Sequence, residues 1–135
     1  MPTEPRTYDV YGANRALPEV RALVSQIVEL SGQLPDLQDQ LRILEYGMRR
    51  PAAGPEDGDR FEAAATVLRR AEDDLGAALN RLLEMGVRLK DARVGLVDFL
   101  AHRDGELVEL CWKLGEDSVS HWHRVGEGYP GRKSL

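Results

Sequence analysis

The chain has 135 residues, a formal net charge of −5 and a single cysteine, and no apolar run approaches the ~20 residues that cross a bilayer. This length fits one domain with a modest core. The lone cysteine excludes an intramolecular disulfide and fits a reducing cytoplasm, while the negative charge argues against general nucleic-acid binding. Because the N-terminus also lacks the layout of a signal peptide, we expect a cytoplasmic protein of one domain over residues 1–135, outside membranes.

The first predicted element is a long helix over residues 18–50. Pro18 suits a helix start, and apolar residues then recur in steps of three and four, which is typical of a heptad seam. The seam consists of Val20, Leu23, Ile27, Leu30, Leu34, Leu37, Leu41, Leu44 and Met48. Pro35 removes a helical hydrogen bond, but the seam keeps its phase across this residue, so we predict a kink near residue 35 that Gly32 eases. The alternative is a break at Ser31 and Gly32 with a restart at Pro35.

A loop rich in proline and glycine precedes a second predicted helix over residues 59–86. Gly86 suits its C-terminal cap. The seam of this helix alternates large and small residues: Phe61, Ala64, Leu68, Ala71, Leu75, Ala78, Leu82 and Met85. The two helices would form a long, antiparallel, coiled-coil-like hairpin. Its distal half either is self-sufficient or forms a homodimer through the helices, and both possibilities are open.

A three-stranded β-meander is predicted over residues 95–125, followed by a tail over 126–135. Asp104 and Gly105 lie between two apolar runs and suit a two-residue hairpin loop, which would pair Asp98 with Cys111. In the same register Leu100 pairs with Glu109, Phe99 with Leu110 and Val97 with Trp112. A five-residue connection then leads to a third strand, which would place His121 beside Cys111 and His123 beside Glu109. The predicted fold class is therefore α+β, with the small sheet packed on one end of the helical hairpin.

This register gathers chemically active side chains on one face of the sheet. His121 and His123 would project the same way and could bind one divalent metal ion, with Cys111, Asp98 or Glu109 as a third ligand. Zinc best suits a set of nitrogen, sulfur and carboxylate ligands, and iron or manganese suits histidines and carboxylates alone. A metal with an open coordination position could acidify a bound water and support hydrolysis.

Two other interpretations of this face are open. Cys111 beside His121, with Asp98 or Glu109 orienting a histidine, has the elements of a thiol-dependent enzyme. Alternatively the cluster is structural, and the protein is a helical interaction or dimerisation module without catalytic activity that binds an unknown protein partner. Two residues outside the cluster are candidates for ligand binding: Glu116 in the connection and Arg132 in the tail.

Several motifs of the C-terminal part also resemble a known family. They are Gly95-Leu96-Val97-Asp98-Phe99, Cys111-Trp112-Lys113-Leu114-Gly115-Glu116, Trp122-His123 and Gly128-Tyr129-Pro130-Gly131-Arg132. Together with Tyr8, Ala13-Asn14 and Leu17-Pro18, they resemble a bacterial family known only as a domain of unknown function. The resemblance implies a small cytosolic protein with a helical hairpin and a short sheet, and it implies no reaction, substrate or partner. Pro35 and the loop over residues 51–59 depart from the smooth long helices of that family.

Overall fold

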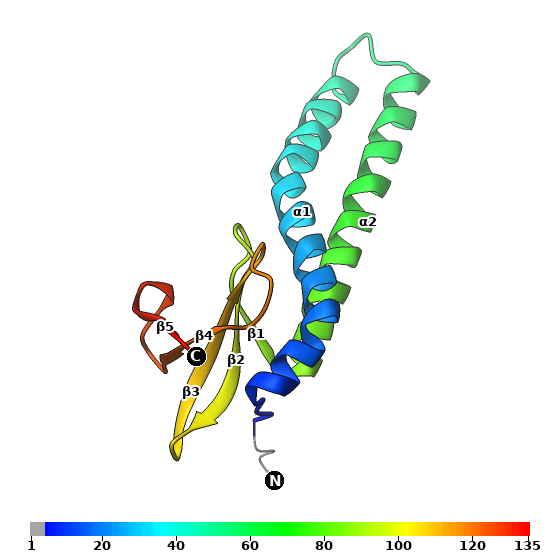
Figure 1. Cartoon of the computed structure of the whole chain (residues 1–135). Helices are drawn as coiled ribbons and strands as arrows, with labels where there is room; N and C mark the ends of the chain where they lie inside the picture. The colour runs from blue at the N-terminus through cyan, green and yellow to red at the C-terminus, as the bar shows by residue number, and fades with distance from the viewer. Residues whose placement is uncertain (1–4) are drawn as a thin grey trace.

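The computed structural model describes residues 5–135 and places two long antiparallel helices against one face of an antiparallel sheet (Figure 1). The elements are α1 (Val10–Met48), α2 (Pro55–Met85), β1 (Val87–Asp91), β2 (Leu96–Arg103), β3 (Glu106–Lys113), β4 (His121–Arg124), a short 3₁₀ turn at Tyr129–Gly131 and β5 (Lys133–Ser134). The strands lie side by side in the order β1-β2-β3-β4-β5. The predicted α+β fold, a helical hairpin followed by a small antiparallel sheet, is confirmed.

α1 starts earlier than predicted. It begins at Val10 rather than at residue 18, because Asp9 caps it by accepting a hydrogen bond from the Gly12 backbone N–H at 2.6 Å. Pro18 and Pro35 therefore both lie inside the helix. Both prolines are exposed, on the side where water can bond the carbonyls that they leave free. α1 runs unbroken through Pro35, so the alternative with a break at residues 31–32 is wrong.

α2 also starts earlier, at Pro55 instead of residue 59. Proline suits the first turn of a helix, and the Asp57 carboxylate accepts from the Gly54 N–H at 2.8 Å. The predicted end is confirmed: Gly86 follows Met85 with a φ of +74°, and its N–H points back to the carbonyls of the last turn. β1 begins directly after this glycine.

The sheet has the predicted registers. Asp104 and Gly105 have φ values of +52° and +79°, which is typical of a type I′ turn, and Asp98 pairs with Cys111. β4 pairs with β3 as expected, with His121 opposite Cys111 and Glu109 opposite His123. The strand count was wrong, because β1 adds to one edge of the predicted three strands and β5 to the other. Residues 126–135 are therefore more than a tail.

The core lies between the sheet and the adjoining halves of the helices. Phe99 and Trp112 are fully buried on the face turned toward α1, whose buried residues are Ala13, Leu17, Val20, Val24 and Ile27. The Tyr8 ring meets Phe99 edge-on at 5.2 Å, and its hydroxyl donates to the Met85 carbonyl. No side chain over residues 28–70 is buried, so the distal halves of both helices stand clear of the sheet (Figure 1). Within residues 5–135, neither helix combines the length and the apolar character that crossing a bilayer demands.

Candidate metal centre

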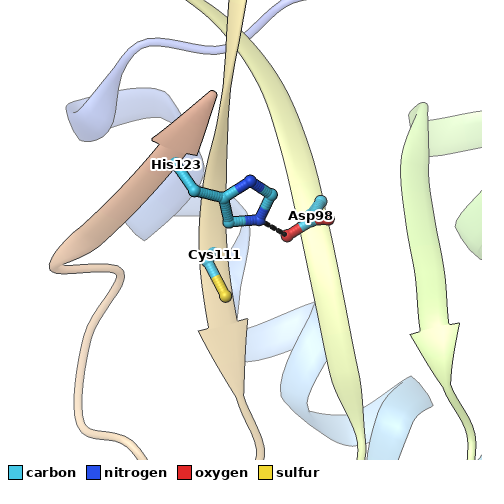
Figure 2. A group of neighbouring side chains, drawn as sticks. All are labelled: Asp98, Cys111 and His123. Atoms are coloured by element: carbon cyan, nitrogen blue, oxygen red, sulfur yellow. Dashed lines mark hydrogen bonds and ion pairs between the residues drawn. The ribbon is translucent and has the colours of Figure 1, made fainter. Parts of the chain in front are cut away.

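Three adjacent strands bring Asp98, Cys111 and His123 together on the face of the sheet that points away from the helices. Asp98 comes from β2, Cys111 from β3 and His123 from β4, and Figure 2 shows the three side chains on neighbouring strands, with the His123 ring turned toward Asp98. Side chains alternate along a strand, so these residues point opposite to their core-facing neighbours. Their ligand atoms all lie within 4.8 Å of one another, and all three side chains are buried. This arrangement could hold a metal ion.

The hydrogen bonds of His123 fix its tautomer. Its Nδ1 lies 2.9 Å from the Arg124 carbonyl oxygen, which can only accept, so Nδ1 carries the hydrogen. Nε2 lies 3.1 Å from Asp98 Oδ1, the contact drawn dashed in Figure 2. In the neutral ring Nε2 holds a lone pair, so a proton or a cation must be shared between it and the carboxylate. A backbone carbonyl that orients a histidine in this way is typical of metal ligands.

Two buried carboxyl groups lie side by side in the same place. Burial raises the pKa of Asp98 to about 6, and the neighbouring Glu109 carboxyl adds to this rise while His123 opposes it. Glu109 is buried too, and its Oε2 has no hydrogen-bond partner within residues 5–135. The nearest cation is Lys90 of β1, whose Nζ lies 3.9 Å from Asp98 Oδ2 and 3.9 Å from Glu109 Oε2. The site therefore has more oxygen ligands than the protein's own donors satisfy.

Cys111 is a protonated, inaccessible thiol. Burial, together with the neighbouring Asp98 carboxylate, raises its pKa to about 11, and the Arg132 guanidinium partly opposes this rise. Only about one thiol in ten thousand would then ionise at neutral pH. Because the thiolate is the reactive form, this environment disfavours a cysteine nucleophile. A bound metal could still deprotonate the sulfur and use it as a ligand.

The family profile described as "Uncharacterized conserved protein (DUF2203)" matches residues 6–135. The chain belongs to the DUF2203 family. This match bears out the resemblance that the C-terminal motifs indicate. No curated protein and no solved structure matches the chain.

His121 occupies the predicted position in this DUF2203 chain but does not join the trio. It lies opposite Cys111, half-buried, with its Nδ1 3.0 Å from Ser120 Oγ. The group of close ligand atoms contains His123 instead. The sequence therefore located both histidines on the correct face, and the structure distinguishes their surroundings.

Glu116 and Arg132 bind each other. Two hydrogen-bonded contacts join them, Nη1 to Oε1 at 2.9 Å and Nη2 to Oε2 at 2.6 Å, and Arg132 also lies over the Tyr129 ring at 4.1 Å. Arg132 thereby lowers the pKa of Glu116, against the effect of its partial burial. Glu116 further accepts from the Lys113 N–H at 2.8 Å. This ion pair fastens the C-terminal segment beside Cys111.

Lys90 is the member of the site that the sequence analysis missed. It lies on β1, which was not predicted because it is short and follows α2 after a single glycine. The signal was present in the alternation of Val87, Arg88, Leu89 and Lys90. In this chain β1 supplies the cation that faces both carboxylates.

Proposed function

We propose that this DUF2203 protein binds one divalent metal ion, with zinc preferred over iron or manganese. Asp98, Cys111 and His123 supply the ligands, and Glu109 is available as a fourth. The decisive observation is the lone pair of His123 Nε2 facing Asp98 Oδ1 at 3.1 Å inside a buried site. Nitrogen, sulfur and carboxylate ligands around one point are the set that zinc favours.

Charge balance supports this proposal. Two carboxylates, Lys90 and one shared proton sum to zero, and the site is neutral in that form. A divalent cation that displaces this proton and the Cys111 proton again gives zero, since the thiolate adds one negative charge. Neutrality matters because an uncompensated charge is expensive to bury. Metal binding should accordingly release about two protons.

Glu109 decides what the metal can do. If Glu109 binds as a fourth ligand, the centre is closed, and zinc then stabilises the sheet. If only three protein ligands bind, the fourth position can take a water that the metal acidifies, and hydrolytic chemistry follows. The carboxylate of Glu109 would then lie beside that water as a general base. The buried Oε2 of Glu109, which accepts no hydrogen bond within residues 5–135, favours the closed form.

The test is metal analysis of protein purified without an affinity tag and titrated with zinc, iron and manganese. We expect stoichiometric zinc, lost in Asp98→Asn and His123→Gln. His102 is an exposed histidine at the far end of β2, so His102→Gln is the matched control and should keep its metal. His121→Gln tests whether the second histidine contributes, and we expect it to retain zinc.

Cobalt substitution isolates the role of Cys111. A thiolate bound to Co²⁺ absorbs strongly through sulfur-to-metal charge transfer, and Cys111→Ser should abolish that absorption. The proposal fails if the protein stays metal-free in all three titrations. It also fails if Asp98→Asn and His123→Gln bind zinc as tightly as the unaltered chain does.

A second candidate function is self-association through the helices. Ile43 and Tyr46 of α1 are 70% and 72% exposed. They are three residues apart in the helix, so they lie side by side on its surface and form one apolar patch. Two copies packed antiparallel about Ile43 would cover this patch in both chains, and twofold homodimers are the commonest oligomers.

A further inference from the structure

The apolar surface of α2 extends beyond the β1 edge of the sheet. β1 is an edge strand, and among residues 5–135 it pairs with β2 alone. α2 nevertheless continues its apolar surface past this edge through Leu79 and Leu83, and Leu83 is 77% exposed. A strand added beside β1 would lie beneath these two leucines and cover them.

A groove marks the place of that missing strand. It has a volume of about 990 Å³ and lies between the end of α2, β1 and the two residues Pro5 and Arg6. Its apolar lining comes mainly from Leu79, Leu82, Leu83, Val87, Leu89 and Leu100. An apolar groove beside an open strand edge is the arrangement that binds extended peptides by β-strand addition, in which backbone hydrogen bonds hold the peptide and alternate side chains fill the groove.

Positively charged side chains beside the β1 edge determine which kind of peptide could bind there. Arg88 and Lys90 alternate with Val87 and Leu89 along β1 and both are exposed, and Arg88 also borders the groove. Arg88 forms no ion pair within residues 5–135, while Arg6 contributes a third cation at the rim. Side chains on an added strand alternate between the two faces. Residues of the occupant that lie on the same side as Arg88 would therefore be near its guanidinium, whereas Lys90 already faces Asp98 and Glu109 at 3.9 Å.

A second copy of the chain does not fit this edge. Antiparallel pairing of β1 with itself about Leu89 would place Arg88 directly opposite Lys90 of the other copy, twice. Like charges in directly opposed positions destabilise a sheet. The register shift between Leu89 and Asp91 also ends the regular edge after Leu89. Pairing of β1 with a second copy of itself in this register is therefore unfavourable. Because the regular part of the strand is short, contacts in the groove must contribute much of the affinity for a bound peptide.

We infer that the β1 edge and its groove bind an extended segment of a partner protein in which acidic and apolar residues alternate. The apolar residues cover Leu79 and Leu83, and the acidic ones lie beside Arg88. The inference does not depend on the metal site, since none of the proposed metal ligands lines the groove and Lys90, which faces Asp98 and Glu109, is not used in it.

The test uses two short blocked peptides, one alternating Glu with Val and the other alternating Lys with Val. Binding to the full chain is measured by calorimetry and by backbone amide shifts of β1. We expect only the Glu peptide to bind. Leu83→Glu should weaken it by about tenfold or more, because it places a charge in the groove where a valine would lie. Val125→Glu adds the same charge at an exposed apolar position after β4, which is separated from β1 by two strands, and should leave binding unchanged.

A charge reversal gives the sharper readout. The Arg88→Glu protein should no longer prefer the Glu peptide and should instead bind the Lys peptide. A variant that merely failed to fold would not gain binding of the Lys peptide. Equal binding of both peptides, or binding that Leu83→Glu leaves unchanged, overturns the inference. A dimer of the unaltered chain that Leu83→Glu dissociates would also overturn it, because the groove would then hold a second copy.

Discussion

Replacing Asp98 by asparagine should stabilise the metal-free protein at neutral and alkaline pH. Burial raises the Asp98 pKa from 3.8 to about 6, so folding favours the protonated carboxyl. The stability contributed by this group is complete below pH 3.8 and is lost as the pH rises through about 6. Above that pH the ionised carboxylate is kept in a site that disfavours its charge. Asparagine has nearly the same shape and no charge to bury.

The magnitude follows from the shift. A rise from 3.8 to about 6 corresponds to about 3 kcal/mol, which is the most that the asparagine could recover at pH 8. The side chain is almost fully buried, so solvent screening reduces this little. Weaker hydrogen bonding to His123 costs about 1 kcal/mol, which leaves about 2 kcal/mol net. In a domain of this size that is roughly 4–10 °C in Tm.

The assay is thermal and urea unfolding of chelator-treated protein between pH 3.5 and 8.5. The difference between Asp98→Asn and the unaltered chain should grow between pH 4 and 6 and then level off. Added zinc should reverse the order, because only the unaltered chain gains stability from the metal. If Asp98→Asn is destabilised equally at pH 4 and pH 8, Asp98 is not strained by burial and the electrostatic reasoning is refuted.

Three further predictions concern other parts of the molecule. Cys111 should react with a disulfide reagent only as fast as the protein unfolds, and rapid labelling of the native chain would contradict its burial and its pKa of about 11. Gly95→Ala should lower the free energy of unfolding in urea by about 2–4 kcal/mol, because Gly95 has a φ of +74° and a Cβ there would lie 2.7 Å from Leu114 Cβ. Gly105→Ala is the control: Gly105 has a φ of +79° but open space around it, so this substitution should lower the free energy of unfolding by about 1 kcal/mol. Ile43→Glu should convert a helix-mediated dimer to monomers in light scattering, and a chain already monomeric at high concentration would exclude that dimer.

The fold was largely predictable where two independent signals agreed. In the β2–β3 hairpin the Asp104-Gly105 turn and the apolar alternation specify the same register, and that register placed Asp98 opposite Cys111. The spacing of apolar residues in steps of three and four likewise predicted the two long antiparallel helices. The errors lie where one signal was misleading: Pro18 suggested a start, although an exposed proline is tolerated in a helix that Asp9 caps earlier.

The sequence predicted which residues of the site share one face of the sheet, but it did not predict how their side chains are oriented. Strand parity put both histidines on the correct face, yet it cannot tell how each ring turns. His123 turns inward because the Arg124 carbonyl holds its Nδ1, whereas His121 bonds Ser120. Lys90 was missed because its strand is short and follows α2 after a single glycine, although the alternation along β1 was a signal for it.

Lys90 offers the final discrimination between a metal site and a structural ion network. Its ammonium lies equally far, 3.9 Å, from Asp98 Oδ2 and Glu109 Oε2, so it competes with a metal for the same two carboxylates. Lys90→Met should therefore tighten zinc binding, by several-fold to about tenfold, while it destabilises the metal-free protein at alkaline pH. Lys133→Met on β5 removes a comparably exposed lysine and should change neither property. A structural network predicts the loss of stability without the gain in affinity, so a Lys90→Met protein that is less stable and binds zinc no more tightly would exclude these carboxylates as metal ligands.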